Sequence, residues 1–221
     1  MNNHKKVDCC FLVTSNSKKS YQKLSNTYSA IEPPTWALLL AQSMRSFGFN
    51  VKIIDANAEA LDEKEIYDRI KKISPRLICF VVYGQNVNAG TTNMSGTVLV
   101  SKYLKNKNLG IPISIIGSHV QALPIETLNK EESIDFVFTN EGVYSLKNIL
   151  SLDSFKATNL KDIKGIGYRD NKKALLTEPE KVVPNEKMDI DLPGYAWDLL
   201  PFKNKPLDLY RAPMWHAEYD F

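Results

Sequence analysis

The sequence predicts an α/β domain of the doubly wound, flavodoxin-like (Rossmann-like) kind, with a five-stranded parallel sheet followed by a β-hairpin and an extended arm. Through residues 1–150, short apolar runs alternate with amphipathic segments, which is the pattern of βα units. The run 77–82 is apolar throughout, as in strands buried on both faces of a parallel sheet. Residues 151–221 change to two short β runs and frequent prolines, so we expect a hairpin and linker there.

The elements of the predicted domain follow from its apolar runs and from the prolines and glycines at their ends. The expected strands are 7–13, 51–54, 77–82, 111–116 and 135–138. The expected helices are 33–47, 61–73, 93–104, 123–128 and 142–150. The first helix has Pro33 and Pro34 at its start and Gly48 past its end, as capping preferences predict. The second must stop before Pro75, since a residue preceding proline disfavours helical backbone.

The remaining residues predict a connecting arm rather than a second core. The β runs 165–168 and 175–177 flank the turn-forming residues 169–172, which favours a hairpin. Five prolines between Pro184 and Pro213 exclude long helices. The arm is also rich in tyrosine and tryptophan, so it is expected to pack on this domain or on a following one.

Composition narrows the class of protein. The chain has 221 residues and a formal charge of +3, which is too small and scattered for a nucleic-acid binder. No apolar run approaches the roughly 20 residues of a spanning helix, and no secretory signal is present, so we expect a cytoplasmic protein without membrane contact. Cys9, Cys10 and Cys79 lie in apolar runs at spacings that match no zinc or iron–sulfur site, which predicts buried thiols and no metal ligands.

The candidate site is the carboxyl edge of the sheet, where loops and helix N-termini of open parallel sheets meet ligands. These loops carry small, hydroxyl or amide residues and no evident nucleophile, so we expect no catalytic residue here. No G-x-G-x-x-G, Walker lysine or G-x-S-x-G motif follows a strand. The side chains of these loops suit a large ligand that carries polar groups around its edge. The candidates are Thr14, Asp55, Asn57, Glu59, Tyr83, Gly84, Gln85, Asn86, Gly117, Ser118, His119, Asn140, Glu141 and Gly142.

Several of these positions have a purely structural alternative. Asp55 and Asn57 could form a turn or cap the helix that follows, and Glu141 and Gly142 could cap the last helix of the domain. His119 at a strand end could be a hydrogen-bonded surface residue.

In combination, the motifs resemble the cobalamin-binding domain that precedes many radical S-adenosylmethionine (SAM) domains. They are 33–41, 55–59, 93–96, 116–124 and 140–142, followed by 165–171 and 192–201, which resemble that family's linker. The resemblance covers nearly the whole chain and adds five residues to the candidate cofactor-binding set, namely Pro34, Thr35, Asn93, Met94 and Leu123.

The resemblance implies a corrinoid lying flat on the carboxyl edge, with its nucleotide tail in a slot between strands and helices. One branch of such domains ligates cobalt through the histidine of an Asp-x-His-x-x-Gly loop. The matching loop here looks like Asp55–Glu59 and has Asn57 at the histidine's position, which implies cobalamin without a protein histidine on cobalt. The chain has no Cys-x-x-x-Cys-x-x-Cys loop, so SAM and a [4Fe–4S] cluster would belong to a radical domain missing from it.

The sequence therefore predicts the cobalamin-binding module of a radical SAM enzyme, a methyltransferase, that presents the corrinoid to a radical domain in cis or in trans. Three alternatives stay open. The chain could be a stand-alone corrinoid carrier, a non-catalytic flavodoxin-like binding or sensor module, or a nucleotide- or sugar-binding Rossmann enzyme that lacks the glycine fingerprint.

Overall fold

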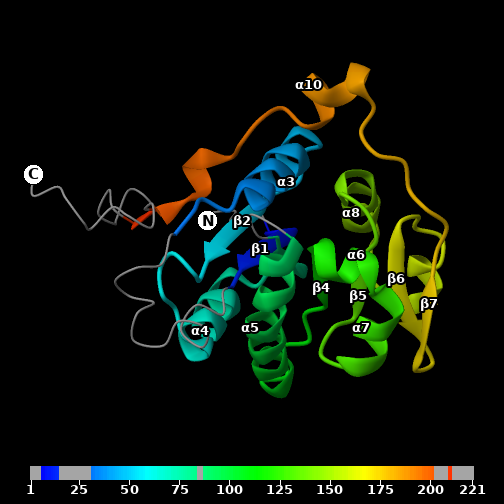
Figure 1. Cartoon of the computed structure of the whole chain (residues 1–221), viewed down its shortest axis with the longest axis horizontal. Coiled ribbons are helices and arrows are strands. Elements are labelled where there is room, and N and C mark those ends of the chain that lie inside the picture. Colours follow the sequence, from blue (N-terminus) through cyan, green and yellow to red (C-terminus); the bar gives the residue numbers. More distant parts are fainter. Residues whose placement is uncertain (1–5, 15–30, 84–86, 202–208, 211–221) are drawn as a thin grey trace, which may run out of the picture.

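The computed structural model describes residues 6–14, 31–83, 87–201 and 209–210, with the backbone alone for 87–92. Within these residues the chain forms one seven-stranded sheet in the order β2-β1-β3-β4-β5-β6-β7. The first five strands are parallel and the last two antiparallel, which confirms the doubly wound α/β prediction (Figure 1). The strands are β1 Cys9–Val13, β2 Val51–Asp55, β3 Leu77–Val82, β4 Ile113–Gly117, β5 Phe136–Phe138, β6 Ile166–Asp170 and β7 Lys173–Leu176.

Helices cover both faces of this sheet, and the strand residues alternate between two cores. Cys9 and Phe11 of β1 pack with helices α3 and α8, whereas Cys10 and Leu12 pack with α4, α5, α6 and α7 on the other face. The period of two along the strand sends successive side chains to opposite layers. The helices are α3 Thr35–Ser46, α4 Glu63–Ile73, α5 Val87–Asn106, α6 Ser118–Ala122, α7 Pro124–Lys130 and α8 Val143–Leu150.

The hairpin is not an appendage, as the five-strand prediction implied, but extends the same sheet. β6 pairs antiparallel with β5, placing Tyr168 opposite Phe136. Strand β5 has only three residues, and β6 covers the edge that it would otherwise leave unpaired. The turn is tighter than expected, because Asn171 and Lys172 both have positive φ, as in a two-residue hairpin loop.

The observed helices differ from the predicted ones mainly in two places. Helix α5 begins at Val87 rather than near residue 93. The short helix expected over 123–128 is α7, which starts at Pro124, a residue well suited to a first helical turn. It is preceded by α6, a helix that was not predicted and that starts directly after β4.

After β7 the arm turns back over α8 and α3 (Figure 1). Its described part contains only one-turn helices, as the prolines predicted: α9 Ala157–Leu160 precedes the hairpin, and η2 Asn185–Lys187, α10 Met188–Asp191 and η3 Trp197–Leu199 follow it. The arm packs on this domain through small and aliphatic side chains. Ala196 is fully buried, and its N–H donates a hydrogen bond to the Leu38 carbonyl of α3 at 3.2 Å.

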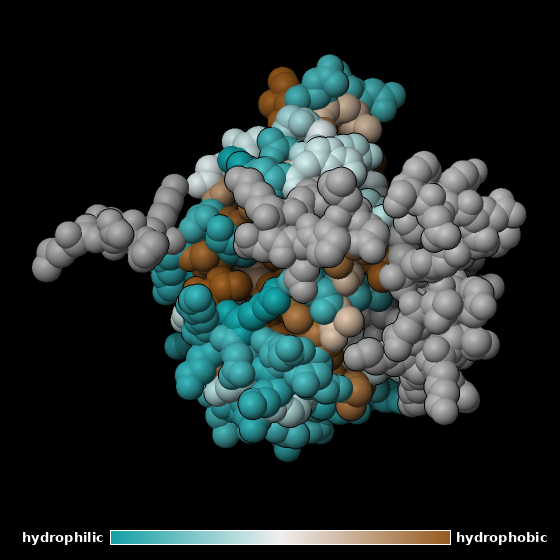
Figure 2. Space-filling model, turned by 90° about the vertical axis from the view of Figure 1, so that its left-hand side faces the viewer, coloured by the Kyte–Doolittle hydropathy of each residue, from teal (hydrophilic) through white to brown (hydrophobic). Residues whose placement is uncertain are grey.

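Two aromatic residues in the described part of the arm do not pack on this domain. Tyr195 and Trp197 stack on each other, with ring centroids 5.2 Å apart, and are 42% and 47% exposed. Figure 2 shows a further small hydrophobic area at the top of the molecule, where α10 exposes Met188 and Ile190. The lower part of the same view, over α4, is mainly hydrophilic.

The expectations for thiols and membrane contact can be compared with the described residues. All three cysteines are free and buried there, as predicted. None of the helices in the described ranges is long and apolar enough to cross a membrane.

Candidate functional site

The carboxyl edge of the sheet brings the ends of β1 to β5 together with the starts of α3, α6 and α8. Thr14 follows β1 and is 8% exposed. Its hydroxyl shares a 2.8 Å hydrogen bond with the hydroxyl of Thr97 on α5. A buried hydroxyl pair thus ties the end of the first strand to the helix after β3.

Asp55 ends β2 and is almost fully buried, at 2% exposure. Its Oδ1 accepts a hydrogen bond from the Ala58 N–H at 3.0 Å, which closes a tight turn over 55–58. Its Oδ2 accepts one from the Tyr210 hydroxyl at 2.9 Å. The turn is anchored to the neighbouring strand because the Ala56 N–H donates to the Val13 carbonyl at 2.9 Å.

Burial raises the pKa of Asp55 from 3.8 to about 6. The hydrogen bonds from Ala58 and Tyr210 oppose that rise, and the nearby charge of Glu59 adds to it. Desolvation disfavours the ionised carboxylate, so a carboxylate retained here destabilises the fold at neutral pH. Such perturbed groups concentrate at functional sites.

Glu59 is held by Arg69 of α4 in a two-pronged ion pair, with Nη–Oε distances of 2.6 and 2.9 Å. The Glu59 side chain is 6% exposed, so this is a largely buried carboxylate with a fixed partner. Asn57 lies half-buried between Asp55 and Glu59. The two carboxylates therefore fix the turn that carries the Asn57 amide.

Tyr83 follows β3 and lies against Trp36 of α3, with ring centroids 5.4 Å apart. The Gln121 amide of α6 donates hydrogen bonds of 2.6 Å to the Tyr83 hydroxyl and to the Asn140 carbonyl. Burial, chiefly, raises the pKa of Tyr83 to about 12, so its phenol stays neutral. The indole nitrogen of Trp36 is buried and has no hydrogen-bond partner within the described residues.

Gly117 has a role in strand packing. A Cβ at this position would lie 2.2 Å from the Val82 carbonyl oxygen of β3. Ser118 and His119, which follow it, are half-buried in the first turn of α6.

The loop after β5 binds the arm. Asn140 accepts a hydrogen bond from the Gly142 N–H at 2.9 Å and donates one to the Glu180 carbonyl at 3.0 Å. Glu141 accepts one from the Val183 N–H at 2.5 Å. Gly142, with φ +82°, is the N-cap residue of α8, in agreement with the capping alternative.

The remaining predicted residues are dispersed. Thr35 is exposed in the first turn of α3 after Pro34, the N-cap residue, whereas Met94 is 7% exposed and belongs to the core beneath α5. Asn93 is half-buried on α5, and Leu123 is 39% exposed between α6 and α7. The predicted residues Gly84, Gln85 and Asn86 lie outside the described residues.

Three residues of this edge were not among the predicted ones: Thr97, Gln121 and Tyr210. Gln121 lies inside the 116–124 motif, two residues after His119, so the motif could have indicated it as a candidate. Tyr210 lies in the proline-rich arm, 155 residues from Asp55, and no spacing in the sequence connects the two.

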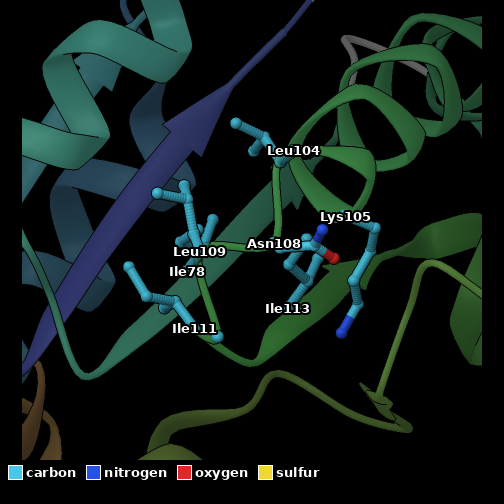
Figure 3. A pocket seen from close by; sticks show the side chains of 8 residues that line it. Ile78, Leu104, Lys105, Asn108, Leu109, Ile111 and Ile113 are labelled. Atoms are coloured by element: carbon cyan, nitrogen blue, oxygen red, sulfur yellow. The ribbon is translucent and has the colours of Figure 1, made fainter.

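Two cavities of the described structure lie at the opposite, amino edge of the sheet. One, of about 280 Å³, is lined mainly by isoleucine and leucine where the end of α5 meets the starts of β3 and β4 (Figure 3). Its volume is below the roughly 300–1,000 Å³ of typical ligand pockets. The other lies beside Asn50 at the start of β2. Neither is lined by a residue predicted for the site.

The carboxyl edge fits a large amide-rimmed ligand better than either cavity. It offers hydroxyl and amide groups, such as those of Thr14 and Asn57, together with the buried indole N–H of Trp36, which has no partner among the described residues. A corrin ring carries amide side chains around an apolar face, and these groups can pair with such donors and acceptors. The described residues contain no cluster of three metal-ligating side chains.

Comparison with known proteins places the chain in a family. Residues 22–150 match the model of the B12 binding domain. The chain is 32% identical over 180 residues to "Uncharacterized methyltransferase PH0819" of Pyrococcus horikoshii, covering 81% of this chain and 36% of that protein. It is 24% identical over 173 residues to the anaerobic magnesium-protoporphyrin IX monomethyl ester cyclase of Synechocystis sp., covering 77% and 32%.

The fold is similar to parts of solved structures. The cobalamin-dependent SAM radical enzyme OxsB, with aqua-cobalamin and SAM bound, matches with a TM-score of 0.58 and 17% identity, covering 85% of this chain and 25% of that one. The radical SAM methyltransferase TsrM of Kitasatospora setae, with cobalamin and a [4Fe–4S] cluster, matches with a TM-score of 0.56 and 16% identity, covering 81% and 30%. The chain spans about a third of the length of its curated relatives. With more than half of its residues matched by the family model, the chain belongs to the B12-binding domain family.

Proposed function

We propose that this chain binds cobalamin at the carboxyl edge of its sheet and presents it to a radical SAM domain, as the cofactor module of a methyltransferase. The observation that carries the proposal is the match of residues 22–150 to the B12-binding family. The fold shared with OxsB and TsrM and the methyltransferase name of the Pyrococcus relative support the rest.

The residues proposed to contact the corrinoid are the strand-end residues of the candidate set. When bound, cobalamin supplies a cobalt centre able to carry and transfer a one-carbon group. The chain's part is to hold it: Thr14 and Asn57 offer polar contacts, and the neutral Tyr83 phenol, fixed by Gln121, closes the middle of the edge. Asn57 presents an amide in place of an imidazole, so we propose no histidine ligand from that position.

Several proposed cofactor contacts also have structural roles. Glu59 and Asn140 position neighbouring segments through the contacts described above, and Gly117 allows β4 to pack against β3. We therefore expect Asn57 to be the most informative single position, because it lies in the middle of the turn that Asp55 and Glu59 hold in place.

We place SAM and the iron–sulfur cluster in a separate radical domain, in cis or in trans, since the match covers only 36% and 32% of the two relatives. A cytoplasmic location without nucleic-acid or membrane contact is proposed from the small net charge and from the lack of a spanning helix in the described ranges.

The experiment is to add hydroxocobalamin to the purified chain, desalt it, and record the visible spectrum. A retained corrinoid chromophore at a ratio near one per chain is expected. Asn57→Ala should lower retention, whereas Asn106→Ala, an exposed asparagine at the end of α5 on the opposite edge, should leave it unchanged. Loss of the whole chromophore from the wild-type chain on desalting would contradict the proposal.

A further inference from the structure

The described part of the arm contacts the carboxyl edge at two places. Near β5, the backbone of 180–183 is bound by Asn140 and Glu141. On the far side of the sheet, Tyr210 reaches Asp55 at the end of β2. Between these points the arm crosses α8 and α3, where Asp191 accepts a hydrogen bond from Tyr144 at 2.7 Å. The family match ends at residue 150, so this contact at β2 lies outside what the family model assigns.

The Tyr210 contact has the features of a specific interaction rather than casual packing. Its hydroxyl lies 2.9 Å from Oδ2 of a carboxylate that is 2% exposed. Burial, followed by the nearby Asp55 charge, raises the pKa of Tyr210, so the phenol keeps its proton and acts as the donor. A hydrogen bond to a charged acceptor in a desolvated place is among the stronger kinds.

Asp55 transmits this contact to the turn that carries Asn57. Its other oxygen holds the Ala58 N–H, one residue beyond Asn57. On the far side the Ala60 N–H donates to the Asn57 carbonyl at 3.2 Å, with Ala60 at φ +52°. The backbone of Asn57 is therefore held on both sides, which fixes the direction of its Cα–Cβ bond while Asp55 stays in place.

A role in stability alone does not explain why a carboxylate stands here. A buried carboxylate with a raised pKa destabilises the folded chain at neutral pH, and an uncharged residue would fill the same space without that penalty. Groups kept in such an unfavourable state are characteristic of functional sites.

We infer that Tyr210 is a positioning residue of the cofactor site: its hydroxyl fixes Asp55, which sets the direction of the Asn57 amide at the rim. The inference rests on the proposed function, since it assigns an arm residue to the same cobalamin site. The binding unit then includes the arm as far as residue 210.

The test is a titration of the full chain with hydroxocobalamin, followed by visible absorption, on wild type, Tyr210→Phe, Asn57→Ala and the double variant. Phenylalanine keeps the ring and removes only the hydroxyl. We expect Tyr210→Phe to raise the Kd about tenfold, equivalent to about 1.4 kcal/mol. In the chain that already carries Asn57→Ala, the same change should raise it less than about twofold, because Tyr210 acts through Asn57. Tyr195→Phe, on an exposed arm tyrosine, is the control and should match wild type.

The outcomes separate the two proposals. An unchanged Kd in Tyr210→Phe, with wild type binding normally, overturns the positioning role and leaves the proposed function standing. An equal loss of affinity with and without Asn57→Ala also overturns it, because the hydroxyl would then act through general stability. A wild-type chain that binds no cobalamin overturns both.

Discussion

Replacing Asp55 with asparagine tests the electrostatics of the candidate site directly. Asparagine is nearly isosteric with aspartate, its Oδ1 can still accept from the Ala58 N–H, and its amide can donate to the Tyr210 oxygen. The substitution therefore removes the buried charge while the two contacts keep their geometry. We expect Asp55→Asn to stabilise the folded chain at neutral pH.

The magnitude follows from the pKa. The folded value of about 6 lies about 2 above the ordinary value of 3.8, and one pKa unit corresponds to about 1.4 kcal/mol. Because the folded pKa is the higher one, the folded state keeps the proton that the unfolded state has lost between pH 3.8 and 6. Stability consequently falls as pH rises through this window, and the full penalty of about 3 kcal/mol is present above it.

The assay is urea unfolding of wild type and Asp55→Asn, followed by tryptophan fluorescence at several pH values between about 4.5 and 8. Subtracting the two free energies of unfolding cancels every other titrating group. The variant's advantage should grow from about 1 kcal/mol near pH 4.5 to about 3 kcal/mol near pH 8. A difference that does not change with pH, or that favours wild type more strongly as pH rises, would refute the reasoning.

Three further substitutions test other contacts of the fold, two of them at the candidate site. Gly117→Ala should lower the free energy of unfolding in urea by about 2–3 kcal/mol, because the new Cβ meets the Val82 carbonyl of the adjacent strand. Arg169→Met should speed amide hydrogen exchange in β6, β7 and α7 more than elsewhere, since the guanidinium binds carbonyls at the end of α7. Tyr83→Phe should reduce stability by about 1 kcal/mol in the same urea assay by removing one hydrogen bond.

Much of the fold could be predicted because its signals are local. The strand 77–82 was predicted with its observed bounds, because the ends of an unbroken apolar run between polar residues define the ends of the strand. The start of α5 was missed because glycine and threonine at 90–92 are poor helix formers. The hairpin was predicted, but its place beside β5 depends on contacts about 30 residues apart, and no local pattern encodes such pairing.

The site could be predicted only in part for a related reason. Carboxyl ends of parallel strands converge, so sequence order alone brings Thr14, Asp55 and Tyr83 to one edge. Their hydrogen-bond partners, in contrast, lie in other parts of the chain. Thr97, on the helix after β3, binds Thr14, and Tyr210 binds Asp55, through contacts that depend on how helix and arm pack.

The arm's contacts change how the edge of the sheet should be understood. Cutting the chain after residue 150 would uncover β5, whose edge is paired by β6, and would free Glu141 from the Val183 N–H. It would also remove Tyr210, leaving the buried Asp55 carboxylate with one hydrogen-bond donor fewer. Both flanks of the candidate site would loosen even though the five parallel strands remained. The shape of the rim is thus determined jointly by the parallel sheet, which brings the polar residues together, and by the arm, which fixes their orientation.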